Sequence, residues 1–171
     1  MDVNEEIIRA WLQICKNQFT MDNISFKVYG PKGGSNYSNI DLLAVDSSGT
    51  YYDYEVKWRS VYSISSTDRE TPRELTKQLI NKEREEKIRS IIGRTACKKL
   101  FITTYAFFGK SPDKRARIER LFQKKKISVL YFEDIIPELM GKINTHGRYD
   151  SPILQTIRML KYFDLIKEKS D

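Results

Sequence analysis

The residues best suited to chemistry lie in a stretch of alternating pattern at residues 52–59. Successive side chains of a strand point to opposite faces of a sheet, so Glu55 and Lys57 share one face. Asp41 begins an apolar run that ends at Val45. An acid next to such a run takes a place near the core and needs a functional reason. A hairpin pairing these two segments would bring Asp41, Glu55 and Lys57 together.

These three side chains suit the hydrolysis of a phosphodiester bond assisted by a metal ion. Mg²⁺ can activate the water, neutralise the phosphate and stabilise the leaving oxygen. It prefers hard oxygen ligands and keeps several waters. Asp41, Glu55 and the main-chain carbonyl of Val56 are the candidate ligands. Lys57 could orient the water, take its proton or hold the phosphate, and a nearby metal ion is expected to lower the pKa of this lysine.

Asp41 followed by the Glu-x-Lys tripeptide at residues 55–57 resembles the PD-(D/E)XK nuclease superfamily, which includes many restriction enzymes and archaeal Holliday-junction resolvases. The order of elements expected over residues 4–132 is similar to the core of that fold. Ile40 stands where the motif's name has proline. The resemblance implies a restriction-endonuclease-like fold, cleavage of DNA with Mg²⁺ or Mn²⁺, and catalytic roles for the acids and the lysine.

The resemblance also suggests two further site residues. Related resolvases carry a metal-directed glutamate on the first helix, where Glu5 lies nearer the apolar stripe than Glu6. The alternative is that both acids only complement the positive end of the helix dipole. Gln78 is a secondary candidate, because family members often have a glutamine on the helix after the lysine strand. Its alternative role is that of an ordinary solvent-facing polar residue.

A nucleic-acid surface is expected around these acids. The glycine-rich segment 30–39 precedes Asp41 and is predicted to be a loop whose backbone can approach phosphate. An ordinary turn is the alternative for this segment, and a solvated face is the alternative for the basic cluster at 110–126. The candidate phosphate-binding residues are Lys32, Ser35, Asn36, Arg59 and Arg69.

The hydrophobic periodicity predicts an α/β fold. Three strands in a meander, followed by two strands reached through helical crossovers, predict a mixed central sheet with helices on both faces. We expect one domain over residues 1–171, with a core at 4–132 and a helical C-terminal extension at 133–171. A helix from Pro72 to Ile92 is expected to bend near Arg84. The other expected helices are 4–18, 112–124, 134–140 and 152–167, and the expected strands are 24–29, 40–45, 51–59, 100–104 and 127–132.

The amino-acid composition also limits the classes of partner, metal site and location that can be expected. Among 171 residues, Lys and Arg outnumber Asp and Glu by 30 to 23, which favours a polyanionic partner or simply a basic protein. Cys15 and Cys97 form no CxxC pair, so a thiolate metal site is not expected. The acidic start and the lack of a long apolar run predict a cytoplasmic protein.

Three functions compete at this point. The first is a Mg²⁺-dependent DNA endonuclease acting as a homodimer, with the choice between DNA and RNA left open. The second is an inactive module of the same fold that binds nucleic acid, and the third is a protein-interaction domain using the last helix. The simplest structural alternative is that Asp53, Glu55, Lys57 and Arg59 form a solvated strand face with surface ion pairs.

Overall fold

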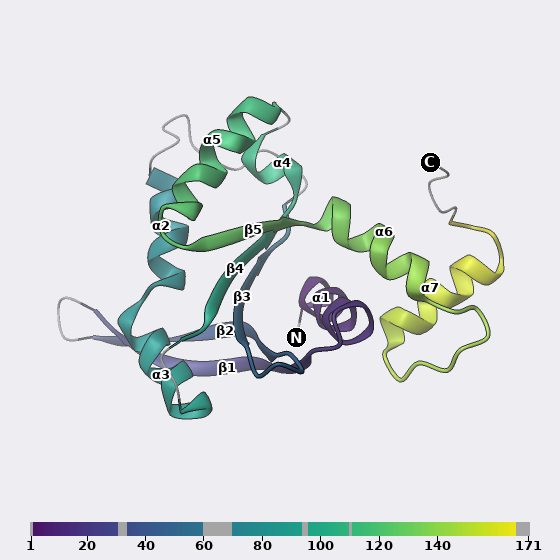
Figure 1. Cartoon of the computed structure of the whole chain (residues 1–171), viewed down its shortest axis with the longest axis horizontal. Helices are drawn as coiled ribbons and strands as arrows, with labels where there is room; N and C mark the ends of the chain where they lie inside the picture. The colour runs from purple at the N-terminus through teal and green to yellow at the C-terminus, as the bar shows by residue number, and fades with distance from the viewer. Residues whose placement is uncertain (1, 31–33, 60–69, 94–95, 110, 167–171) are drawn as a thin grey trace.

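A computed structural model describes residues 2–30, 34–59, 70–93, 96–109 and 111–166 (Figure 1). Within these ranges no helix is long and apolar enough to cross a membrane. The elements are, in chain order, α1 (Val3–Cys15), β1 (Phe19–Tyr29), β2 (Ser35–Val45), β3 (Tyr51–Lys57), α2 (Glu70–Leu79), α3 (Lys82–Ile92), β4 (Lys98–Thr103), α4 (Tyr105–Phe108), α5 (Pro112–Gln123), β5 (Ile127–Tyr131), α6 (Phe132–Lys142) and α7 (Pro152–Tyr162).

The strands form one five-stranded sheet in the order β1-β2-β3-β4-β5. β1, β2 and β3 pair antiparallel, whereas β3, β4 and β5 pair parallel. Parallel neighbours need a crossover connection, which α2 and α3 supply before β4 and α5 supplies before β5. The mixed sheet predicted from the sequence is confirmed.

Helices cover both faces of the sheet, as Figure 1 shows. On one face α1 and α6 pack with Tyr54 and Val56 of β3 in the largest hydrophobic cluster. On the other face Phe101 of β4 packs with residues of α2, α4 and α5, and Ile88 of α3 packs on β1 and β2. The alternation predicted for β3 is therefore confirmed. The side chains of Tyr54 and Val56 face α1, whereas those of Asp53 and Glu55 face α3.

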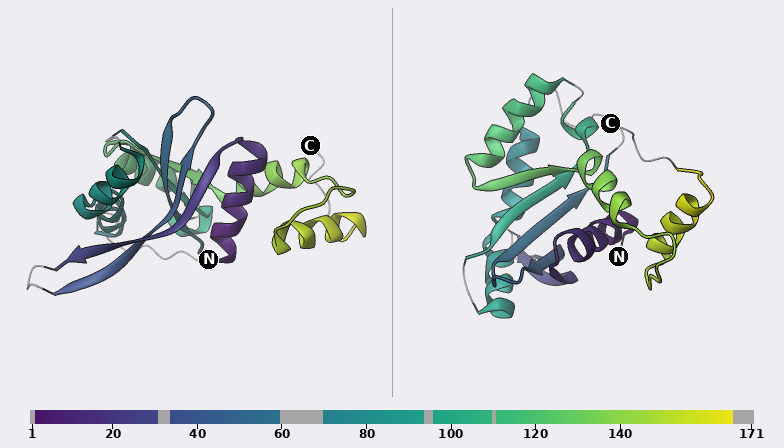
Figure 2. Two further views of the ribbon diagram at one scale, coloured as in Figure 1. Left: turned by 90° about the horizontal axis from the view of Figure 1, so that it is seen from below. Right: turned by 45° about the vertical axis from the view of Figure 1, so that its right-hand side comes forward.

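The hairpin of β1 and β2 is longer than predicted. Each strand has eleven residues, and the pairing continues out to Tyr29 and Ser35. Figure 2 shows the hairpin projecting from the body of the molecule. Residues 35–39 are exposed and have no apolar alternation, so the sequence predicts a loop there; the backbone ladder with β1 makes them a strand instead.

The predicted long helix over 72–92 is two helices, with the break at Ile80 and Asn81 rather than near Arg84. Asn81 caps α3, because its side chain accepts hydrogen bonds from the backbone N–H groups of Glu83 at 2.8 Å and Arg84 at 3.2 Å. An asparagine at this position satisfies donors that a new helix leaves unpaired. The new helix direction turns Arg84 toward the sheet.

Smaller differences lie at the ends of elements. Trp58 follows the end of β3 with 41% of its surface exposed and packs edge-on against Phe132, so it lies at the rim of the core and not inside it. The short helix α4 is not predicted from the sequence. α7 ends at Tyr162, and the last predicted helical residue, Lys167, lies outside the described residues. Figure 2 shows α6 and α7 extending to one side of the sheet.

Candidate active site at the end of the β2–β3 ladder

Asp41 lies where the pairing of β2 with β3 stops. The last pair of this ladder is Leu42 with Tyr54, so Asp41 is one residue beyond it. The Asp41 side chain is buried, and its Oδ2 accepts a hydrogen bond from the backbone N–H of Val56 at 2.7 Å. The carboxylate thus takes the place of a backbone acceptor from β2 and ties the ends of the two strands together.

The Val56 carbonyl points toward the same side of β3 as Asp41. In a strand, the N–H and C=O of one residue point in the same lateral direction. Because the Val56 N–H meets Asp41, the carbonyl of Val56 also faces the β2 side. Asp41 and this carbonyl are two oxygen donors on one side of the strand, as the sequence predicts for a metal site.

Glu55 is held between two cations. Its Oε1 lies 2.8 Å from Nζ of Lys57, and its Oε2 accepts from Nη1 of Arg84 at 2.7 Å. Glu55 is 4% exposed and Asp53 is fully buried. The alternative of a solvated strand face is therefore wrong for these two acids, because α3 covers them.

Arg84 is the centre of a buried network that the sequence reasoning missed. Its guanidinium donates to both oxygens of Asp53, with Nη2 at 2.6 Å from Oδ1, while only 1% of the residue is exposed. Nζ of Lys99 adds a contact of 3.3 Å to Asp53. A signal was present, since Arg84 precedes the apolar residues Ile88 and Ile91 at helical spacing and so shares their face.

Burial is the main influence on the ionisation of Asp41. Burial, repulsion from Glu55 and repulsion from Glu5 together raise the pKa of Asp41 to about 6, against the opposing effects of the Val56 N–H and Lys57. A divalent cation would relieve this repulsion, because opposite charge favours the ionised carboxylate.

Neighbouring acids control the pKa of Lys57. Burial lowers its pKa, but attraction to Glu55, a hydrogen bond to Glu55 and attraction to Asp41 together raise it above the ordinary lysine value. The downward shift was expected beside a bound metal ion and stays a prediction. Lys57 is an ammonium ion here, suited to donating hydrogen bonds.

Hydroxyl groups at the end of β4 and directly after it fix the backbone beside Lys57. The Thr103 hydroxyl donates to the carbonyl oxygen of Lys57 at 2.8 Å. The Thr104 hydroxyl donates to the carbonyl oxygen of Arg59. Both threonines are buried. The end of β3 is thus anchored to the end of β4 by side chains in addition to the parallel ladder.

Glu5 has the helix-end role, and its role as a metal ligand stays a prediction. It is the third residue of α1, and its Oε2 accepts from the backbone N–H of Asp2 at 3.4 Å in a capping box. Its charge also contributes to the raised pKa of Asp41. Glu6 instead accepts from the hydroxyl of Ser151 at 2.6 Å and so joins α1 to the start of α7.

The predicted nucleic-acid residues are only partly brought to this centre. Arg59 is exposed just after Lys57. Ser35 and Asn36 are exposed on β2, with Asn36 roughly 17 Å along the strand from Asp41. Gln78 is exposed on α2, in agreement with its solvent-facing alternative. Lys32 and Arg69 lie outside the described residues.

The oxygen donors allow a test of the fit to Mg²⁺ or Mn²⁺. Among the residues that the structure describes, no group of three or more His, Cys, Asp or Glu side chains is placed to hold a metal ion. The donors are instead two carboxylates, Asp41 and Glu55, with one carbonyl. Within the same residues, Oδ1 of Asp41 receives no hydrogen bond. One or two carboxylates are the usual protein contribution to Mg²⁺, with waters and substrate phosphate completing the shell, so the set fits.

Comparisons with protein-family models, curated proteins and solved structures found no match to this chain. The geometry of the site is therefore the basis for a functional assignment.

Proposed function

We propose that this chain is a metal-dependent endonuclease that hydrolyses phosphodiester bonds of DNA, with a restriction-endonuclease-like arrangement of its sheet. The observation that carries the proposal is the meeting of Asp41, Glu55 and Lys57 at the end of the β2–β3 ladder. The three residues interact there electrostatically, and Lys57 lies 2.8 Å from Glu55. The antiparallel meander followed by a parallel crossover strand places this set at the end of the ladder between two neighbouring inner strands.

Asp41, Glu55 and the Val56 carbonyl would hold Mg²⁺ or Mn²⁺. The bound ion would make a water nucleophilic near neutral pH and neutralise the phosphate. The Lys57 ammonium orients that water or binds a phosphate oxygen, in keeping with its raised pKa. Arg84 positions the Glu55 carboxylate from the α3 side. Because Arg84 is buried, it would not contact the substrate.

A second function is favoured by one specific contact. Both oxygens of Glu55 are engaged by internal cations, Oε1 by Lys57 and Oε2 by Arg84. If these contacts neutralise Glu55 fully, the same surface would bind nucleic acid, or a protein partner, without cutting. The remaining lone pairs of each carboxylate oxygen can still accept a metal ion, which is why catalysis is the first proposal.

A cleavage assay separates the two functions. The parent chain is incubated with Mg²⁺, Mn²⁺ or EDTA on linear, supercoiled, single-stranded and four-way-junction DNA, and on RNA. We expect cleavage of DNA that needs the metal ion and is lost in Glu55→Gln. Glu86→Gln is the matched control, because it makes the same change at an exposed position on α3. Binding of DNA without cleavage under all metal conditions would instead identify the inactive binding module.

A further inference from the structure

The hairpin of β1 and β2 continues past the candidate active site as an arm, formed by residues 25–29 and 35–39. Figure 2 shows this arm leaving the body of the molecule. One face of the arm is covered, because Phe26 is buried with Ile88 of α3 and Val28 packs against the same cluster. The side chains of β1 that point to the opposite face of the arm are exposed, namely Ser25, Lys27 and Tyr29.

The cross-strand register gathers two aromatic rings and an ammonium group on this exposed face. Residues directly opposite each other in an antiparallel pair share a face, and Lys27 is opposite Tyr37. Nζ of Lys27 also lies 5.5 Å from the centroid of the Tyr29 ring. Ser25 and Asn39 lie on the same face, where the Ser25 hydroxyl donates to Oδ1 of Asn39 at 2.8 Å. These side chains can therefore contact one ligand together.

Tyr37 has a ring that the fold itself does not use. Its surface is 78% exposed, and within the described part of the chain its side chain makes neither a hydrogen bond nor a ring contact. Tyr29 is 63% exposed. Such rings add nothing to the core, whereas a nucleobase of any sequence gains affinity by stacking on them.

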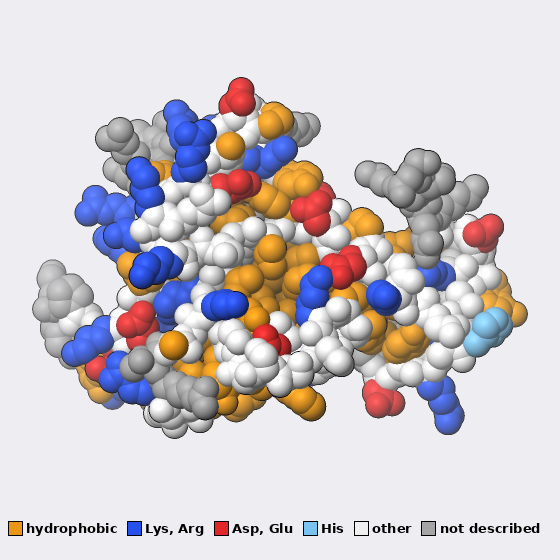
Figure 3. Space-filling model, viewed as in Figure 1, with side chains coloured by type: hydrophobic (Ala, Val, Ile, Leu, Met, Phe, Trp, Pro, Cys, Tyr) orange, Lys and Arg blue, Asp and Glu red, His pale blue; other side chains and the backbone are white. Residues whose placement is uncertain are grey.

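The arm has positive charge and no acid. Residues 23–40 include Lys27 and Lys32 but neither Asp nor Glu. The acids that flank this stretch are Asp22, in an ion pair of 3.7 Å with an arginine of α1, and Asp41 of the candidate site. Figure 3 shows Lys and Arg side chains gathering over α2, α3 and α5, on the side of the molecule from which the arm projects. An anionic ligand suits this surface, whereas a second copy of the arm would bring like charges together.

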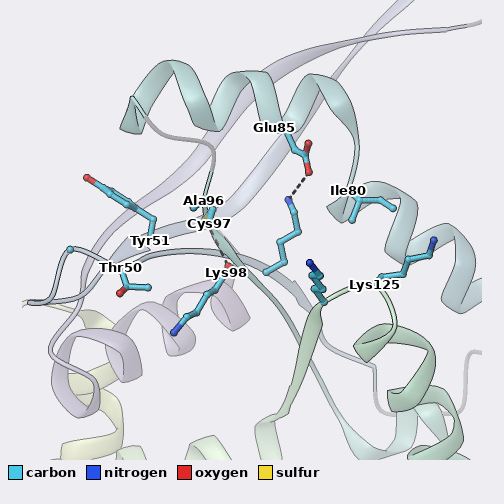
Figure 4. Close-up of a pocket in the computed structure, with 11 residues that line it drawn as sticks. Thr50, Tyr51, Ile80, Glu85, Ala96, Cys97, Lys98 and Lys125 are labelled. Atoms are coloured by element: carbon cyan, nitrogen blue, oxygen red, sulfur yellow. Dashed lines mark hydrogen bonds and ion pairs between the residues drawn. The ribbon is translucent and has the colours of Figure 1, made fainter.

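A lysine-rich cavity of about 710 Å³ at the far end of β3 does not combine charge and rings in this way. Figure 4 shows Lys98 and Lys125 pointing away from each other. Lys98 lies over the Tyr52 ring, and Lys99 is 3.6 Å from Glu85 in the same wall. The cations of the cavity are thus divided between separate directions, whereas those of the arm share one face with its rings.

We propose that the exposed face of the arm binds unpaired bases of a DNA strand, with Tyr37 stacked on one base and Lys27 on a neighbouring phosphate. A paired base presents its edges to a protein, whereas an unpaired base offers its flat face. The DNA strand would continue along β2 toward Asp41, roughly 13 Å from Tyr37, which is about four stacked nucleotides. The inference rests on the proposed function and specifies its substrate class as DNA with an unpaired segment.

The test is fluorescence anisotropy of the full chain with labelled DNA, in EDTA so that cleavage does not interfere. The parent should bind a single strand more tightly than an abasic strand of the same length, which keeps the phosphates but has no bases. Tyr37→Thr should weaken binding of the single strand about tenfold and leave the abasic strand unaffected. Threonine suits a β-strand, so the arm should keep its pairing. Tyr37→Phe keeps a ring and should retain the parental affinity.

Two controls match the variants. Phe19→Thr makes the corresponding change on the same hairpin outside the arm, at a side chain that is also 78% exposed, and should leave binding unchanged. Lys27→Ala should weaken binding of both DNA strands and reduce the slope of log affinity against log salt by roughly 0.7, the value for one phosphate contact. Lys142→Ala, at an exposed position of α6, should do neither.

Three results would overturn the proposal. Absence of single-strand binding, or equal affinity of the parent for single, abasic and duplex DNA, would leave at most a general anionic surface. Equal effects of Tyr37→Thr and Phe19→Thr would remove the stacking. A lower mass of Tyr37→Thr in light scattering, with DNA binding unchanged, would identify the arm as a contact between copies. Failure of the proposed function looks different, because the parent would bind the single strand through Tyr37 but would not cut it with Mg²⁺ or Mn²⁺.

Discussion

Arg84 and Glu55 are joined by a hydrogen bond of 2.7 Å that connects the helix before β4 to an acid of the candidate active site. The same guanidinium holds Asp53 and is almost completely buried. Removing it would leave two buried carboxylates with less compensation. Arg84 therefore matters for stability as well as for the position of Glu55.

We predict that Arg84→Met lowers the free energy of unfolding by about 3–5 kcal/mol, the usual cost of breaking a buried ion pair from one side. Adding Asp53→Asn should recover part of the loss, because it removes the uncompensated charge. Urea unfolding of the single and double variants measures both effects. Arg89→Met, at an exposed position of the same helix, should cost less than about 0.5 kcal/mol. Equal losses at positions 84 and 89 would contradict this account.

Lys57→Ala should reduce the rate of DNA cleavage by roughly 10²–10⁴-fold, the usual contribution of a positioned group that handles a proton or a charge. DNA affinity should change little, because one charge among many phosphate contacts matters modestly. Single-turnover cleavage and filter binding on the same DNA measure the two quantities. A variant that cuts at the parental rate would remove Lys57 from the mechanism.

Asp41→Asn should stabilise the fold at alkaline pH. The folded chain keeps a proton on Asp41 up to pH about 6, whereas an unfolded aspartate releases it near pH 4. Stability therefore falls as the pH rises through this window and stays reduced above it. Replacement by Asn should add about 2–3 kcal/mol at pH 8 in EDTA and little at pH 4. Asp150→Asn is the exposed control, and an equal gain at both pH values would exclude ionisation of Asp41 as the cause.

The same variant should separate binding from cleavage. Asp41→Asn removes a proposed metal ligand and also a negative charge from the place where the phosphate must sit. We expect no cleavage, and in EDTA an affinity for DNA equal to or above that of the parent. Binding should also weaken steeply with salt through the release of counterions. Clearly weaker binding by the variant in EDTA would show that Asp41 serves another contact.

We also predict a homodimer, since cutting both strands suits a two-fold pair. α7 and the residues after it expose Met159, Tyr162, Phe163 and Leu165, each by half or more of its surface. Light scattering should give twice the chain mass of 20.1 kDa. Phe163→Ser should shift the chain to the monomer. A parent chain that stays at the monomer mass at micromolar concentration, with and without DNA, would refute the dimer.

Much of the fold could be predicted because its strands alternate clearly. Period-two alternation separates Tyr54 and Val56 from Asp53 and Glu55, and it predicts the central hairpin. The extension of β2 to Ser35 could not be predicted, because exposed polar residues gain their strand conformation from pairing with β1. The break before α3 could have been found from Asn81, a preferred capping residue.

The sequence indicates Asp41, Glu55 and Lys57 as candidate site residues, but it does not indicate which side chains surround them. Arg84 stands between Glu83 and Glu85, where a charged residue ordinarily faces water. Its burial depends on Asp53 and Glu55, which lie far away in the sequence. The pKa of Lys57 likewise depends on which groups surround it once the chain is folded. Such properties depend on tertiary contacts and not on local pattern.

The threonine anchors have a consequence for how the protein is made. Asp41, Glu55 and Lys57 all precede Arg84 and the pair Thr103–Thr104 in the chain. A nascent chain therefore exposes the acids and the lysine before the residues that hold them in place have been synthesised. The proposed active site would therefore be complete only after β4 has joined the sheet, so an incomplete chain would lack the proposed cleavage activity.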